Sequence, residues 1–204
     1  MIKPPTLAAP RLALGLLPLV AIGRQLVIHV QAGFSVLNFF SYFTNLSNLF
    51  AALVLLAGDV WAATARAPSA RQDLLRYAAV VNMSIVGIVF AVLLRDVDLG
   101  ALLPWVNTIL HYIMPVAVVL EWLLAPPATR LGARQLLVCQ VFPFAYLIYV
   151  LLRGAATGWY PYPFLDPAHV GGYAGVVPYA IGIAVAFFVV GWVLAALGRG
   201  LRRS

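Results

Sequence analysis

Residues 175–197 read GVVPYAIGIAVAFFVVGWVLAAL and contain no Asp, Glu, Lys or Arg. An apolar helix of about 20 residues crosses the ~30 Å hydrocarbon core of a bilayer, so this stretch predicts a transmembrane helix. Five earlier stretches have a similar length and are mostly apolar: 11–30, 38–61, 74–94, 101–124 and 133–152. The alternating ten-residue pattern typical of an outer-membrane barrel is absent. We therefore expect an all-α fold, with one domain over residues 1–204 that forms a bundle of six transmembrane helices.

The composition of the whole chain excludes an ordinary soluble domain. Of its 204 residues, 64% are hydrophobic and 9% are charged, whereas soluble domains carry roughly 25% charged residues. A disordered chain is excluded for the opposite reason, because such chains lack the apolar residues that form a core. The single cysteine, Cys139, excludes an intrachain disulfide and any site built from several cysteines.

The basic residues predict how the helices are oriented. The formal net charge is +7, and ten of the thirteen Lys and Arg residues fall on one side of the expected bundle. These ten are Lys3, Arg11, Arg66, Arg71, Arg76, Arg130, Arg134, Arg199, Arg202 and Arg203. Arg95 and Arg153 fall on the opposite side, and Arg24 lies inside the first stretch. Because cytoplasmic segments are enriched in Lys and Arg, we expect a multi-pass protein of the inner cell membrane with both termini cytoplasmic, and no nucleic-acid partner.

The first apolar stretch has a charged start, which a signal peptide also has. It runs past twenty residues, however, and contains Arg24, Gln25 and His29 without a convincing small-x-small cleavage site. We therefore expect it to remain in the mature protein as a helix.

Polar residues inside the second stretch are the first indication of a site. Six of them crowd its first half: Asn38, Ser41, Thr44, Asn45, Ser47 and Asn48. Thr44, Ser47 and Asn48 are three and four residues apart and therefore share one face of a helix. Any one of these residues is explained by hydrogen bonding between membrane helices. Six together predict a water-accessible cavity, since each polar group costs free energy in hydrocarbon.

A second polar stripe lies in the fourth stretch, where Asn107, Thr108 and His111 precede Pro115. A lone membrane histidine is more often a packing residue than a catalyst, but His111 is the best general base available near neutral pH. At 1.5 Å per residue, Thr44 lies about 9 Å and His111 about 14 Å below the outer ends of their helices. Both side chains are therefore expected in the outer half of the bilayer.

These residues predict nucleophilic catalysis if the two helices meet. A neutral imidazole can take the proton of a threonine hydroxyl and so activate it as a nucleophile. Asn45, Asn48 and Asn107 are candidate donors to the oxyanion that then develops. Arg24 is a candidate for binding a fatty-acid carboxylate, although a structural ion pair or a side chain reaching the bilayer surface explains it equally well. Glu121, near the inner end, is expected to pair with a loop arginine.

Three motifs together resemble the bacterial branch of the androgen-induced-gene family of six-helix membrane proteins. They are YFTNLSN at 42–48, HYIMP at 111–115 followed by Glu121 and Trp122, and RG at 153–154 followed by YPYPFLD at 160–166. Animal members of that family are threonine hydrolases that cleave fatty acid esters of hydroxy fatty acids. The resemblance implies Thr44 as nucleophile, His111 as general base, and a lipid or fatty acid ester as substrate. We expect no cofactor.

Other readings of the histidines remain open at this stage. His29 and His111 could bind a haem from two sides, and Asp166 and His169 could join one of them around a metal such as zinc. We favour instead a structural role for Asp166, in which it pairs with Arg153 or Arg95 and holds the outer loop over the bundle.

The competing class of function is a non-enzymatic lipid-binding or small-solute transport protein, in which the same polar stripe lines a path. The second stretch argues against a pore, because its residues 49–57 are entirely apolar.

Overall fold

The computed structural model describes residues 7–63, 69–97 and 102–201, and this part of the chain is helical with no β-strand. Its α-helices are α1 (Ala8–Gln31), α2 (Val36–Phe40), α3 (Phe43–Ala63), α4 (Ala70–Val89), α5 (Pro104–Thr108), α6 (Met114–Leu124), α7 (Ala133–Thr157), α8 (Pro167–Val170) and α9 (Tyr173–Leu201). The chain also has two π-helical turns: η2 (Phe90–Leu94) continues α4, and η3 (Ile109–Ile113) joins α5 to α6. A short 3-10 turn, η4, spans Pro163–Leu165.

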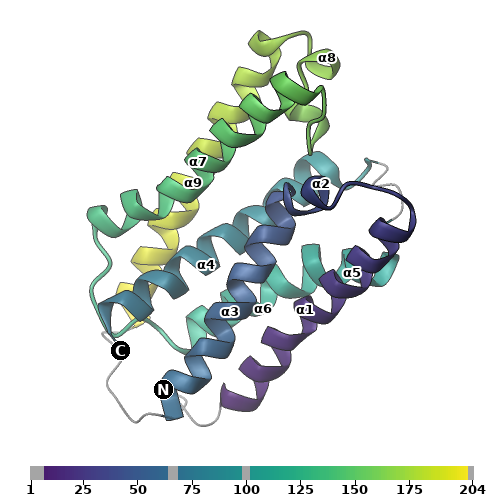
Figure 1. Cartoon of the computed structure of the whole chain (residues 1–204). Helices are drawn as coiled ribbons and strands as arrows, with labels where there is room; N and C mark the ends of the chain where they lie inside the picture. The colour runs from purple at the N-terminus through teal and green to yellow at the C-terminus, as the bar shows by residue number, and fades with distance from the viewer. Residues whose placement is uncertain (1–6, 64–68, 98–101, 202–204) are drawn as a thin grey trace.

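Five described helices are long and apolar enough to cross a membrane: Ala8–Gln31, Ala70–Leu94, Pro104–Leu124, Ala133–Thr157 and Tyr173–Leu201. The all-helical membrane architecture expected from the sequence is therefore present. The second expected stretch differs, because its apolar helix is the shorter segment Phe43–Gly58. α1 begins and α9 ends toward the same end of the bundle (Figure 1).

The second stretch is broken because its first residues form the separate helix α2. The hydroxyl of Ser35 accepts a hydrogen bond from the backbone N–H of Asn38 and so caps the start of α2. At its end, the backbone N–H of Ser41 donates to the Asn38 carbonyl, and the Ser41 hydroxyl donates to the Leu37 carbonyl. A new helix, α3, then begins at Phe43. The break places Thr44 in the first turn of a helix instead of in its middle.

α4 is the central helix of the bundle. With its continuation η2, 56% of its apolar segment is buried inside the protein, compared with 17% for α7 and 22% for α9. α3 and α6 pack against α4, and α7 and α9 lie side by side and extend away toward α8 (Figure 1). Two hydrogen bonds attach α9 to the centre: the Tyr77 hydroxyl donates to the Gly191 carbonyl at 2.7 Å, and Trp122 Nε1 donates to the Leu194 carbonyl at 3.3 Å.

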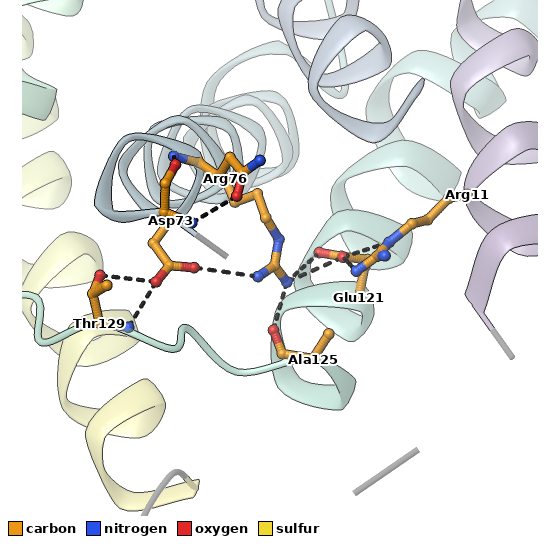
Figure 2. Close-up of polar contacts among 8 residues, drawn as sticks. Arg11, Asp73, Arg76, Glu121, Ala125 and Thr129 are labelled. Carbon is orange, nitrogen blue, oxygen red and sulfur yellow. Dashed lines mark hydrogen bonds and ion pairs between the residues drawn. The ribbon is translucent and has the colours of Figure 1, made fainter. Parts of the chain in front are cut away.

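A buried charge cluster joins α1, α4 and α6 at the end where α1 begins. Glu121 lies between two arginines (Figure 2): Arg11 Nε donates to its Oε1 at 2.9 Å, and Arg76 Nη2 donates to its Oε2 at 3.0 Å. Asp73 accepts hydrogen bonds from the backbone N–H and the hydroxyl of Thr129 at 2.7 and 2.8 Å. Glu121 thus pairs with arginines as expected, but both lie on helices and not in a loop.

Pro115 explains why η3 precedes α6. Proline has no N–H to donate to the carbonyl four residues earlier, which belongs to His111. The chain widens into π-helical hydrogen bonding at Ile109–Ile113, directly before this proline. Gly87 of α4 lies against this point, because a Cβ atom there would be 3.0 Å from Pro115 Cβ. The irregular turn that carries His111 is therefore held against the central helix.

Candidate active site

The structure brings Thr44 and His111 together. Thr44 Oγ1 lies 3.3 Å from His111 Nε2, and the two side chains are 7% and 8% exposed. This distance is slightly longer than an ideal catalytic hydrogen bond, and such contacts often tighten only when substrate binds. The hydroxyl and the imidazole are therefore placed for direct proton transfer.

Thr44 lies at the amino end of α3, where the first backbone N–H groups have no partner within the helix. Two tyrosines from distant parts of the chain supply those partners. Phe43 N–H donates to the Tyr146 hydroxyl at 3.2 Å, and Thr44 N–H donates to the Tyr162 hydroxyl at 3.3 Å. Thr44 therefore lies in the first turn of α3, where the positive end of the helix dipole favours nearby negative charge.

His111 is fixed by packing more than by hydrogen bonds. Its ring stacks on Phe90 with 4.2 Å between centroids, so the two π-helical turns η2 and η3 meet at this contact. Its second ring nitrogen, Nδ1, is buried and makes no hydrogen bond of ordinary geometry with a described residue. π-Helical turns occur frequently at functional sites. In the described structure, Thr44 and His111 form a pair and no carboxylate completes a triad.

Asn45 and Asn48, two of the candidate oxyanion donors, use their amides to hold the backbone. Asn45 Nδ2 donates to the Phe39 carbonyl at 2.8 Å. Asn48 Nδ2 donates to the carbonyls of Thr44 and Leu110 at 2.9 and 3.2 Å, which commits both of its protons. The third candidate, Asn107, is half-buried, and its Oδ1 has no hydrogen-bond partner among the described residues.

Arg24 is not brought to the pair. It lies in α1 with an exposed side chain, and it makes no ion pair with another described residue. The position suits an arginine that extends along the bundle surface toward the polar headgroups.

The outer loop is held differently from the expectation for Asp166. Its carboxylate accepts a hydrogen bond from the Ala168 backbone N–H at 2.9 Å and pairs with His169 Nδ1 at 2.8 Å. Arg153 instead donates to Asn38 Oδ1 and lies 4.8 Å from the centre of the Trp159 ring. Arg95 is exposed and forms no ion pair with a described residue. Arg153 of α7 therefore contacts Trp159 in the loop and Asn38 of α2, and does not pair with Asp166. These two contacts link α7 to the loop and to α2.

Thr44 lines an apolar cavity of about 140 Å³. Its lining residues come from α3, from α4 and its continuation η2, from α7 and α9, and from the loop that contains η4. Its lining residues are Phe43, Thr44, Ile85, Val86, Val89, Leu94, Gln140, Pro143, Phe144, Tyr146, Leu147, Tyr162, Phe164, Leu165, Ala180, Ile183, Ala184, Phe187 and Phe188. Thr44, Gln140 and the two tyrosine hydroxyls are the polar groups in this set. The hydroxyl of Thr44 is thus presented to an otherwise apolar space.

Tyr146 and Tyr162 were not identified by sequence reasoning. Tyr162 belongs to the aromatic and proline-rich loop, a composition that predicts residence at the membrane interface. In the structure it is 8% exposed and stacks on Phe164 with 5.2 Å between ring centroids. Burial raises the pKa of Tyr162, and its hydrogen bonding with Thr44 opposes the rise. The only available signal was the presence of the loop in one of the three motifs.

No three His, Cys, Asp or Glu side chains within the described segments lie close enough to hold a metal ion. The zinc site considered for Asp166 and His169 is therefore not formed there. His29, the other histidine considered as a haem ligand, lies with Nε2 3.0 Å from the Ser35 carbonyl and packs against Phe34 and Phe39.

Comparison with known proteins gives one family. The family model described as FAR-17a/AIG1-like protein matches residues 31–196, which is more than half of the chain. No curated protein and no solved structure matches this chain. The matched residues include Thr44, His111 and Tyr162.

Proposed function

Because the chain belongs to the FAR-17a/AIG1-like family, we propose that it is an intramembrane hydrolase of lipid esters, with Thr44 as nucleophile and His111 as general base. Fatty acid esters of hydroxy fatty acids, or similar acyl esters, are the substrates. The observation that carries the proposal is the buried 3.3 Å contact of Thr44 Oγ1 with His111 Nε2, in which Thr44 also lines an apolar cavity.

The reaction follows from the atoms of the pair. Thr44 Oγ1 attacks the ester carbonyl carbon while its proton passes to His111 Nε2, and the carbonyl oxygen becomes an oxyanion. Collapse of this intermediate breaks the bond to the alcohol oxygen, which takes the proton from His111. A water molecule then attacks the acyl-threonine, with His111 again as base, and releases the carboxylic acid and the free hydroxyl of Thr44.

The cavity supports an acyl chain as the group next to Thr44. A space of about 140 Å³ is close to the ~150 Å³ cavity that holds a molecule the size of benzene. A long acyl chain must therefore extend beyond it. Phe144 of α7 and Phe188 of α9 line the cavity and are 65% and 43% exposed, so the chain leaves between them into the bilayer.

The polar end of the substrate provides the specificity in this arrangement. Lipid tails are as apolar as the cavity walls, so moving a chain from the bilayer into the cavity yields little free energy. The ester group gains more, because Thr44, His111 and the tyrosine hydroxyls offer it polar contacts. We propose that the protein crosses the inner cell membrane six times. Both termini are cytoplasmic in this proposal, as the distribution of Lys and Arg predicts.

The test is hydrolysis by the purified protein, with branched fatty acid esters as substrates and a fluorophosphonate as covalent probe. Thr44→Val removes the hydroxyl and keeps the shape of the side chain, and His111→Ala removes the base. Both variants are expected to lose labelling and turnover. Thr108→Val is the matched control, because the Thr108 hydroxyl is exposed and donates only to the Pro104 carbonyl of its own helix.

Undiminished hydrolysis by Thr44→Val would contradict the mechanism. If the wild-type protein binds a photoreactive fatty acid in the cavity but hydrolyses no ester, it is a lipid-binding protein and the hydrolase proposal is wrong.

A further inference from the structure

The oxyanion of the proposed reaction needs a hydrogen-bond donor close to Thr44. The two asparagines nearest to Thr44 in sequence cannot easily serve. Asn48 uses both amide protons on backbone carbonyls, and Asn45 is turned toward the Phe39 carbonyl. In many hydrolases the backbone N–H of the nucleophilic residue is an oxyanion donor. Here the Thr44 N–H already donates to the Tyr162 hydroxyl. Asn107, the third candidate, does not line the cavity that Thr44 lines, so we look for the donor among the groups that do.

Tyr162 is such a group. Its hydroxyl lies 3.3 Å from the Thr44 backbone nitrogen, its side chain is buried, and it lines the same cavity as Thr44. The phenolic oxygen accepts the Thr44 N–H, and its hydroxyl also contacts the side chains of Tyr146 and Thr44. Its single proton can turn from these neighbours to an ester oxygen bound beside Thr44. An ester carbonyl attacked by Thr44 Oγ1 places its oxygen within a few ångströms of this hydroxyl.

Tyr146 is the contrasting case. Its hydroxyl also caps α3, by accepting the Phe43 N–H at 3.2 Å, but it donates its single proton to the Ser41 carbonyl at 2.9 Å. The two tyrosines thus have similar positions at the amino end of α3 and different uses for their protons.

We propose that Tyr162 is a catalytic residue that donates its hydroxyl proton in a hydrogen bond to the oxyanion formed at the ester carbonyl. The inference rests on the proposed function. No bond to hydrogen is broken in this step: the proton stays on Tyr162, and the negative charge of the oxyanion is stabilised by the hydrogen bond. Since Tyr162 accepts from the Thr44 N–H, the bond extends the positive end of α3 to the oxyanion, and each hydrogen bond polarises the next.

The experiment compares Tyr162→Phe with Tyr160→Phe in the purified, full-length protein. Loss of one oxyanion donor lowers kcat by ~100- to 1,000-fold, so Tyr162→Phe should lose at least about 100-fold in kcat with KM changed less than about threefold. Tyr160 lies in the same loop, but its hydroxyl is paired with that of Tyr173 at the exposed surface. Tyr160→Phe is expected to keep the wild-type kcat.

A second readout separates catalysis from a purely structural role. A trifluoromethyl ketone that forms a tetrahedral adduct with Thr44 should bind Tyr162→Phe more weakly by the same factor as kcat/KM falls. The corresponding ether, which has no carbonyl, should bind both proteins equally. If kcat is unchanged, or if the ether and the ketone lose affinity together, Tyr162 is not an oxyanion donor.

Replacing Tyr162 by difluorotyrosine covers the case in which Tyr162→Phe does not fold. Difluorotyrosine keeps the ring and the hydroxyl and donates a stronger hydrogen bond. The kcat of this variant should therefore exceed the wild-type kcat, and a kcat equal to wild type overturns the inference. Absence of ester hydrolysis by the wild-type protein is a different result, because it removes the proposed function itself and with it this role for Tyr162.

Discussion

Among single residues, Asn48 has the most constrained position next to the proposed catalytic pair. Its amide joins the Thr44 carbonyl of α3 to the Leu110 carbonyl of η3, and its side chain is fully buried. One side chain thus connects the turn that carries the hydroxyl with the turn that carries the imidazole.

Asn48→Ala is expected to lower the free energy of unfolding by about 1–3 kcal/mol, since it leaves a buried carbonyl without its partner. It should also lower kcat, because the distance from Thr44 to His111 is no longer fixed. Ser84→Ala is the matched control, as the Ser84 hydroxyl bonds only to the Val80 carbonyl within α4. Thermal unfolding in detergent together with ester hydrolysis measures both effects, and equal behaviour of the two variants would contradict this role.

Ionisation of Tyr162 is expected to lower the stability of the folded protein at alkaline pH. Burial raises its pKa in the folded protein above the ordinary value of 10.0. Its contribution to stability is therefore complete below pH 10 and is lost as the pH rises through the raised native pKa. Above pH 10, the Tm of Tyr162→Phe should fall less steeply with pH than the Tm of the wild-type protein. Parallel curves for the two proteins would show that Tyr162 does not contribute to the alkaline transition.

At the scale of helices, hydropathy predicted most of what the chain forms. α7 and α9 begin within two residues of the stretches expected at 133–152 and 175–197, although α7 extends to Thr157. Hydropathy could not reveal the break between α2 and α3, because mean hydropathy over a window does not register local hydrogen bonds, and the break depends on those of Ser35, Asn38 and Ser41.

The candidate site was predictable only in part, for a related reason. Thr44 and His111 stand out as polar residues in apolar stretches, and their depths could be compared by counting residues. Tyr162 stands in an aromatic loop where nothing in the local pattern distinguishes a buried hydroxyl from one at the membrane interface. Its position depends on the contact of the loop with the start of α3, a contact between residues 118 positions apart.

The approach of α1 to α3 gives a test at this scale. A Cβ atom at Gly15 would lie 2.6 Å from Leu56 Cγ and 3.3 Å from the Ala52 carbonyl oxygen, whereas one at Gly23 would meet nothing within 4 Å. Gly15→Ala should therefore destabilise the protein by about 1–3 kcal/mol through overpacking. Gly23→Ala places the same methyl group on the same helix and should be neutral or stabilising by up to about 1 kcal/mol. Thermal unfolding distinguishes them, and a stable Gly15→Ala protein would contradict the close packing.

For the whole molecule, the charge cluster at Glu121 connects three helices far apart in the sequence. Glu121 is 9% exposed and receives hydrogen bonds from Arg11 of α1 and Arg76 of α4. Arg76 also lies 5.6 Å from the centre of the Trp122 ring. Removing the carboxylate charge leaves two arginines facing each other in a poorly hydrated space.

Glu121→Gln is accordingly expected to cost about 3–5 kcal/mol of stability, the range for breaking a buried ion pair by removing one partner. Asp166→Asn affects an ion pair with His169, whose side chain is 66% exposed, and should cost no more than about 1 kcal/mol. Thermal unfolding at constant detergent and salt compares the two. Similar losses would mean that the buried cluster does not hold the bundle together.

The long sequence separation of the site has a consequence for biosynthesis. Thr44 contacts His111, 67 residues later, and the Tyr162 hydroxyl that caps its backbone N–H, 118 residues later. In a chain emerging from the ribosome, α3 is made before η3, so Thr44 and His111 cannot meet until η3 follows. The Thr44 N–H is not capped by Tyr162 until the loop after α7 is made. Under the proposed function, the nascent protein therefore remains inactive until η3 has joined α3.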